Sequence, residues 1–199
     1  MRGIISRALL TAVITMAAGC SDRATTPTGL TATRQPDLSA AFASAGGRHG
    51  FGFNGTASGF PTGAVFLTGG GSYEAASASN TVPSETRVAS GGGFRCIAGV
   101  TQGPLSGCAA GEGVRWDTAQ LLASTNFKCT GADPVKRAST GAETAVLLAD
   151  FYRAGDGIDE SFTAQMIVSD TDLAPDLPGE QNLWVQGVGC GTAVVHFSE

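Results

Sequence analysis

The chain has 199 residues and a formal net charge of −5; 42% of its residues are hydrophobic and only 15% are charged. This composition supports one folded domain with an apolar core. The 29 glycines favour a turn-rich exported β protein over a helical one. A negative surface repels phosphate backbones and anionic headgroups, so we expect neither nucleic acid nor an anionic lipid surface as a partner.

The N-terminal segment has the composition of an export signal. Arg2 and Arg7 precede the apolar run 8–18, which ends close to Cys20. The positive charge holds the N-terminus inside the cell, the apolar run enters the translocation machinery, and small residues fit the signal peptidase. The run has about eleven residues, which is too short to span a bilayer.

This segment resembles the signal of bacterial lipoproteins, in which small residues precede a cysteine that is acylated and becomes the mature N-terminus. Ala17 stands where the family more often has leucine. The resemblance implies a signal peptide over 1–19 and an exported protein whose acylated Cys20 anchors it in the lipid of the cell membrane or the outer membrane. Ser21 is compatible with outer-membrane sorting. The alternative is ordinary secretion after cleavage near Gly19.

Residues 20–48 are rich in Thr, Ala, Ser, Pro and Gly, with few large apolar side chains. We expect a disordered, lipid-anchored linker with a root-mean-square reach on the order of 30 Å. The expected domains are therefore the signal peptide 1–19, the linker 20–48 and one β domain at 49–199.

From residue 49 onward the apolar residues mostly alternate with polar ones and are interrupted by Gly, Pro or Asp, which predicts short antiparallel strands. About eight strands without long helices predict an all-β domain, either an antiparallel β-sandwich or a small β-barrel. Residues 54–56 are expected to form a turn at a strand end, and 118–123 a helical turn or a strand. Strands are expected at 51–53, 63–67, 114–117, 126–129, 182–188 and 192–198.

Two glycine-rich segments are similar to each other. Residues 67–75 and 88–96 each contain three consecutive glycines followed by an aromatic residue. We expect them to form neighbouring strands whose backbones approach closely, with aromatic side chains covering the glycines. The clearest hairpin joins 144–153 to 160–168, because Asp-Gly turn chemistry lies between them.

Five cysteines are an awkward number in an oxidising compartment. If Cys20 is acylated, the other four can form two disulfides. We favour Cys96 with Cys108 and Cys129 with Cys190; the runner-up pairs Cys96 with Cys129. A zinc site is disfavoured, because no C-x-x-C spacing is present.

Other candidate sites have a simpler structural interpretation. Four acids are weak calcium candidates, although turns and strand ends account for them equally well; they are Asp156, Asp159, Asp170 and Asp172. His49 and His196 are the available imidazole bases, but no G-x-S-x-G segment supplies a nucleophile. An aromatic platform for sugars would use one of the large aromatic side chains, most of which we expect in the core; they are Tyr73, Trp116, Tyr152 and Trp184.

Residues 111–117 and 148–153 are similar to segments of secreted bacterial β domains that carry no assigned role. The resemblance implies a single exported domain and transfers no catalytic residue. The sequence therefore predicts a lipid-anchored cell-envelope protein with a non-catalytic binding or structural β domain and no cofactor. Its partner beyond membrane lipid would be an envelope protein, a glycan or a small apolar ligand. The alternatives are a barrel that carries an apolar ligand or carbohydrate, and an envelope hydrolase.

Overall fold

A computed structural model describes residues 47–83, 87–153 and 161–199 of the protein. Strands make up the regular structure of these residues, apart from the short 3-10 helix η1 (Ala75–Ser77), which confirms the all-β prediction. The strands are β1 (Arg48–Gly59), β2 (Ala64–Glu74), β3 (Val88–Ala98), β4 (Arg115–Leu121), β5 (Ser124–Phe127), β6 (Lys136–Ser139), β7 (Thr144–Tyr152), β8 (Ser161–Ser169), β9 (Leu183–Val185), β10 (Gly189–Gly191) and β11 (Ala193–Ser198).

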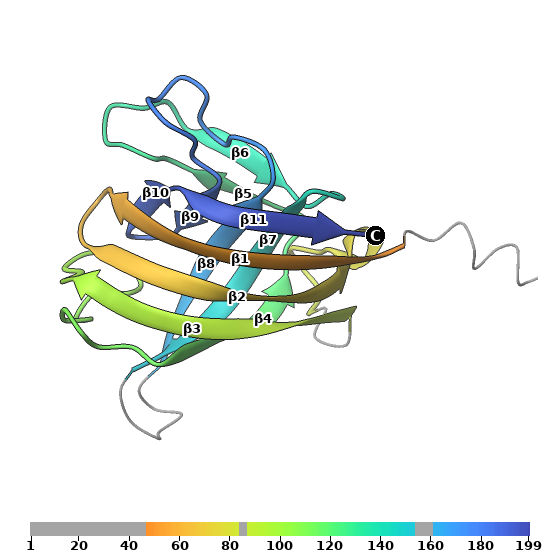
Figure 1. The fold of residues 1–199 in the computed structure, drawn as a ribbon, viewed down its shortest axis with the longest axis horizontal. Helices are drawn as coiled ribbons and strands as arrows, with labels where there is room; N and C mark the ends of the chain where they lie inside the picture. Colours follow the sequence, from red (N-terminus) through yellow and green to blue (C-terminus); the bar gives the residue numbers. More distant parts are fainter. Residues whose placement is uncertain (1–46, 84–86, 154–160) are drawn as a thin grey trace, which may run out of the picture. The chain divides into compact units, whose positions relative to one another are not determined.

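The main sheet closes into a barrel. Its strand order is β10-β9-β8-β7-β4-β3-β2-β1-β11, and the ring closes because β10 also pairs with the end of β1 (Figure 1). β11 follows β10 in the chain and pairs antiparallel with the first half of β1. Closure removes most of the exposed sheet edges that an open sheet would present. Of the two predicted architectures, the structure adopts the small barrel.

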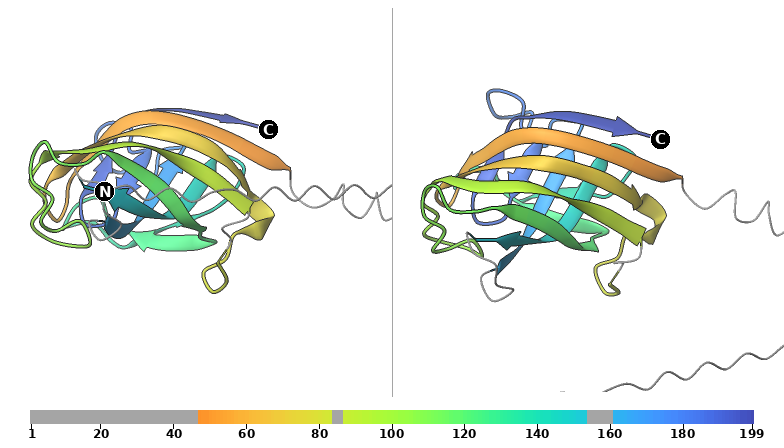
Figure 2. Two further views of the ribbon diagram at one scale, coloured as in Figure 1. Left: turned by 90° about the horizontal axis from the view of Figure 1, so that it is seen from below. Right: turned by 60° about the horizontal axis from the view of Figure 1, so that its bottom comes forward.

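The barrel interior is filled by side chains. β1, β2 and β3 curve over β7 and β8, as Figure 2 shows from two further directions. Phe53 and Trp116 pack with their ring centroids 5.8 Å apart, and Phe94 packs edge-on against Phe151 at 5.0 Å. Trp116 and Phe151 are fully buried. Aromatic rings therefore contribute much of the apolar core of the barrel.

Close backbone approach between β2 and β3 depends on glycine. Gly69 pairs with Gly92, and a Cβ on Gly92 would overlap the carbonyl oxygen of Thr68. Trp116 lies over this stretch: its Cζ2 is 2.7 Å from the position a Gly69 Cβ would take, and its indole N–H donates to Thr68 O at 3.0 Å. The predicted pairing of the two glycine-rich segments is present, and Trp116 from β4 is the aromatic residue that covers them.

Substitution of Gly92 by alanine tests this close approach. We expect Gly92→Ala to lower the free energy of unfolding by about 2–3 kcal/mol or more, because backbone must move to admit the methyl group. Gly52→Ala is the matched control, since its Cβ would meet only Gly69 O at 3.9 Å. Urea denaturation measures both; equal stability of the two variants would contradict the account of the glycine contact.

Two local predictions are corrected by the structure. Residues 54–56 do not form a turn but lie within β1, where Gly55 faces Ala193 so closely that a Cβ would lie 2.6 Å from its Cα. Residues 126–129 were expected to continue the main sheet, yet β5 forms a separate hairpin with β6, a strand the sequence analysis missed. Residues 118–121 belong to β4, and the hairpin of β7 and β8 is present.

Candidate functional site

The β5–β6 hairpin packs on the outside of the barrel. Strand alternation sends Leu147, Met166 and Val185 into the interior, while their neighbours Val146, Ile167 and Trp184 face outward. The hairpin covers these outward side chains and forms a second apolar core with them. The members of that core are Leu122, Phe127, Cys129, Ala138, Val146, Ile167, Ala174, Trp184 and Cys190.

Three contacts fasten the hairpin region to its surroundings. The Cys129–Cys190 disulfide links the residues after β5 to β10. The indole N–H of Trp184 donates to Lys128 O at 3.1 Å. On β6, the Lys136 ammonium lies 2.9 Å from both carboxylate oxygens of Asp176, and its hydrogen bond lowers the pKa of that carboxyl. These contacts hold β5 in a fixed position above the barrel wall.

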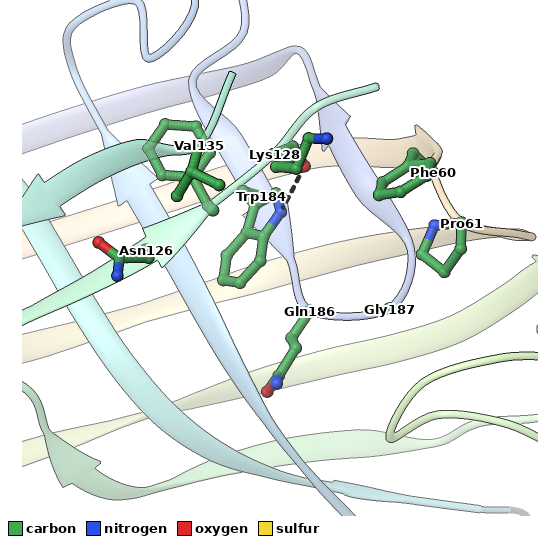
Figure 3. A pocket seen from close by; sticks show the side chains of 9 residues that line it. Phe60, Pro61, Asn126, Lys128, Val135, Trp184, Gln186 and Gly187 are labelled. Carbon is green, nitrogen blue, oxygen red and sulfur yellow. Dashed lines mark hydrogen bonds between the residues drawn. The ribbon is translucent and has the colours of Figure 1, made fainter. Parts of the chain in front are cut away.

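An apolar hollow of about 300 Å³ lies at one end of β5 (Figure 3). Trp184 lies near its centre, with Phe60 and Pro61 on one side and Val135 on the other. Val135 is 66% exposed although it is apolar, whereas Trp184 is only 6% exposed. The buried indole of Trp184 therefore forms the base of the hollow, and the exposed side chain of Val135 forms an accessible apolar rim.

A polar hollow of about 470 Å³ adjoins the first, and the two share Asn126. Its lining consists of Asn80, Ser124, Thr125, Asn126, Arg137 and Gln165. Gln165 of β8 accepts a hydrogen bond from the Thr125 hydroxyl, and its backbone N–H donates to Gln186 Oε1 at 3.0 Å. Gln186 lines the apolar hollow, so this pair of glutamines joins the two spaces. We refer to the two hollows together as the β5 groove.

The free edge of β5 forms one wall of the groove. Thr140 N–H donates to Ala123 O at 3.0 Å, and the alternation of an antiparallel ladder then points the backbone of Ser124 and Asn126 away from β6. The Asn80 side chain acts as a strand partner for Ser124, donating to its carbonyl at 3.0 Å and accepting from its N–H at 3.3 Å. The backbone N–H of Asn126 therefore faces the groove.

Several polar groups of the groove remain available to a ligand. Within the described residues, the side-chain amide of Asn126 and the Nε2 atoms of Gln165 and Gln186 have no hydrogen-bond partner. The Arg137 guanidinium donates to Ser124 Oγ at 2.8 Å, and no described carboxylate forms an ion pair with it. Lys128 lines the apolar hollow and donates to Gly131 O at 2.9 Å. Neither hollow has an acidic side chain in its lining.

The predicted disulfide cysteines are brought together as favoured from sequence. Cys96 bonds to Cys108 and Cys129 to Cys190. Cys20 lies outside the described residues. The two bridges use every other cysteine of the chain, so no cysteine remains to pair with it.

Of the four aromatic residues considered for a platform, Trp184 alone lines the β5 groove. Trp116 and Tyr73 are buried in the barrel; Tyr73 donates to Gly141 O at 2.8 Å, and burial raises its pKa. Tyr152 lies under the Arg115 guanidinium, 4.5 Å from its ring centroid. A platform at the groove would therefore depend on Trp184 and on Phe60, which the sequence analysis did not single out.

The two histidines occupy separate environments. His49 packs against the Tyr73 ring at 5.6 Å, and His196 is exposed on β11 opposite Gly52. Neither histidine lines a hollow of the β5 groove.

Among the calcium candidates, Asp156 and Asp159 lie outside the described residues. Asp172 accepts hydrogen bonds from the backbone N–H of Ala174 and Gln181 at 2.9 and 3.1 Å, and thus shapes a loop. Asp170 is exposed directly after β8. Within 47–83, 87–153 and 161–199, no group of three or more His, Cys, Asp or Glu side chains could hold a metal ion.

Most of the groove residues carry no recognisable signal in the sequence. Asn80, Arg137 and Gln165 are separated along the chain and follow no motif, so only the folded hairpin brings them together. A signal was available in residues 136–139, where the lone buried Ala138 lies between polar neighbours, but four residues are too few for a period to be recognised.

No protein-family model, curated protein or solved structure matches this chain. The part of the chain that the structure describes contains no helix long and apolar enough to cross a membrane.

Removal of the Cys129–Cys190 disulfide tests its role as the fastener of the hairpin. The bond closes a longer loop than Cys96–Cys108, with a sequence separation of 61 against 12. On the chain-entropy account, we expect the Cys129→Ser, Cys190→Ser variant to lose about 4 kcal/mol and the Cys96→Ser, Cys108→Ser variant about 3 kcal/mol. Urea denaturation measures the free energy of unfolding of both variants. Wild-type stability of the Cys129→Ser, Cys190→Ser variant would contradict a role of this disulfide in holding the hairpin.

Proposed function

We propose that this protein is a lipid-anchored component of the bacterial cell envelope whose barrel is a non-catalytic binding module. The ligand site is the β5 groove on the outer wall of the barrel. The observation that carries the proposal is the contrast between the two sides of the wall. Packed aromatic rings lie in the interior, whereas the groove combines an accessible apolar rim with side-chain amide groups that lack protein partners and with the Arg137 guanidinium, which forms no ion pair with a described carboxylate.

The construction of the groove favours recognition over catalysis. Its hollows are lined by amides, hydroxyls, aromatic rings and two cations. General acid–base chemistry would need a carboxylate or an imidazole within hydrogen-bond reach of a bound ligand, and neither hollow has such a side chain in its lining. A largely apolar site with a few well-placed polar groups is typical of ligand binding.

The cysteine count supports the anchor. The two disulfides account for four of the five cysteines, and such bonds form in oxidising compartments. Cys20 follows the apolar run of the export signal and is left over, as an acylated residue would be. Two or three acyl chains on this residue are sufficient for stable anchoring, whereas one chain binds only marginally.

Acylation is tested with the full gene product expressed in a bacterium that processes lipoproteins. We expect the wild-type protein in the membrane fraction, with an intact mass equal to the chain from Cys20 onward plus its acyl groups. Cys20→Ser should be found in the soluble exported fraction without the added mass. A wild-type protein that is soluble and carries no hydrocarbon would contradict the anchor.

Binding at the groove is tested with the soluble Cys20→Ser chain on isolated cell envelopes. We expect the envelopes to retain it, and Val135→Glu to weaken retention by about tenfold or more, because a charged, larger side chain enters the apolar hollow. Val194→Glu is the matched control, since Val194 is an exposed valine (81%) on β11, outside the groove. Equal retention of the two glutamate variants would overturn the assignment of the groove, and no retention of any form would overturn a binding function.

A further inference from the structure

The charge of the β5 groove is opposite to that of the whole chain. The chain has a formal net charge of −5, yet the only charged side chains that line the two hollows are the cations Lys128 and Arg137. A local reversal of sign concentrates ligands of the opposite charge. The groove is therefore suited to an anionic ligand.

Arg137 is placed to bind a carboxylate. One guanidinium nitrogen donates to Ser124 Oγ, and no described acid forms an ion pair with the group. Arginine differs from lysine in that its planar fork can donate two parallel hydrogen bonds to one carboxylate. Lys136, the neighbouring cation, is already engaged by Asp176. The available positive charge of the polar hollow thus belongs to Arg137.

The remaining groups of the groove match the hydroxyls of a sugar. Side-chain amides both donate and accept hydrogen bonds, as ring hydroxyls do. The whole amide of Asn126 and the Nε2 donors of Gln165 and Gln186 have no partner among the described residues, and all three side chains line the two hollows. The apolar hollow beside them presents Trp184, Phe60 and Val135, against which the C–H face of a sugar ring can pack. Volumes of about 470 and 300 Å³ are within the usual range for small-molecule sites.

We propose that the β5 groove binds a saccharide that carries a carboxylate, with the carboxylate on Arg137 in the polar hollow and a sugar ring in the apolar hollow beside Trp184. This inference rests on the proposed function, because it names the ligand class of the same groove.

An extended acidic peptide is less well suited to this site. A peptide that adds to a strand edge needs a row of unpaired backbone groups. On β5, the Asn80 side chain already pairs with Ser124, and Trp184 caps Lys128 O just beyond the strand. Only the Asn126 position between them remains open, which is too short for strand addition.

The test is isothermal titration of the full-length Cys20→Ser chain with trisaccharides of galacturonate, glucuronate and mannuronate, each compared with its methyl ester. The ester keeps the ring and removes the charge. We expect at least one acid to bind about tenfold more tightly than its ester, the worth of one good charge-assisted contact. In Arg137→Gln the acid and its ester should bind equally. Arg95→Gln, an exposed arginine on β3, is the matched control and should behave as wild type.

Each other outcome overturns a stated part of the account. Equal binding of acid and ester in the wild type would overturn the carboxylate on Arg137. Binding of a glutamate-rich peptide in place of every saccharide would overturn the ligand class. Failure of every saccharide, while envelopes still retain the protein through the groove, would overturn this inference and leave the proposed function standing. Loss of envelope retention itself would remove the proposed function as well.

Discussion

The closure of the barrel around a filled interior is the constraint on which the rest of the structure depends. β1 pairs with β2 on one side and with both β10 and β11 on the other, so one strand closes the ring. Where β2 meets β3, paired glycines let the backbones approach closely, and Trp116 lies over them. Aromatic rings, among them Phe53, Trp116 and Phe151, form part of the core that this ring of strands encloses.

The proposed binding surface lies on the outer wall, where strand alternation leaves apolar side chains. Trp184 and Ile167 point away from the interior and would be exposed without the β5–β6 hairpin. The hairpin buries most of this surface, and the Cys129–Cys190 disulfide ties the chain beyond β5 to β10. Beside the hairpin, part of this surface stays accessible, and the β5 groove lies there.

The local features of the fold could be predicted from the sequence because their signals are local. The two glycine-rich segments pair as β2 and β3, the strands of the predicted hairpin pair as β7 and β8, and the favoured disulfide connectivity is present. The Asp-Gly segment expected to turn between β7 and β8 lies outside the described residues. The choice between the two predicted architectures, a sandwich and a barrel, could not be made from the sequence, because the closing pair Ser58 and Cys190 joins residues far apart in the chain. Residues 54–56 were assigned to a turn for the same reason. Gly55 lies within β1 because the strand approaches Ala193 of the last strand closely there, and this contact is not visible in the sequence. Most of the large aromatic residues were expected in the core, but the sequence neighbours of Trp184 do not reveal that it belongs to the outer core. Assembly of the groove from Asn80, Arg137 and Gln165 likewise depends on the tertiary fold.

The two tryptophans of the chain lie on opposite sides of the barrel wall, and each indole N–H donates to a backbone carbonyl. Their side-chain resonances therefore report separately on the interior and on the groove. The most direct measurement is a ¹H–¹⁵N correlation spectrum of the soluble Cys20→Ser chain during addition of an acidic trisaccharide. The account predicts that the Trp184 indole signal moves while the Trp116 signal stays in place. Movement of the Trp116 signal with no change at Trp184 would place the ligand inside the barrel and contradict the account.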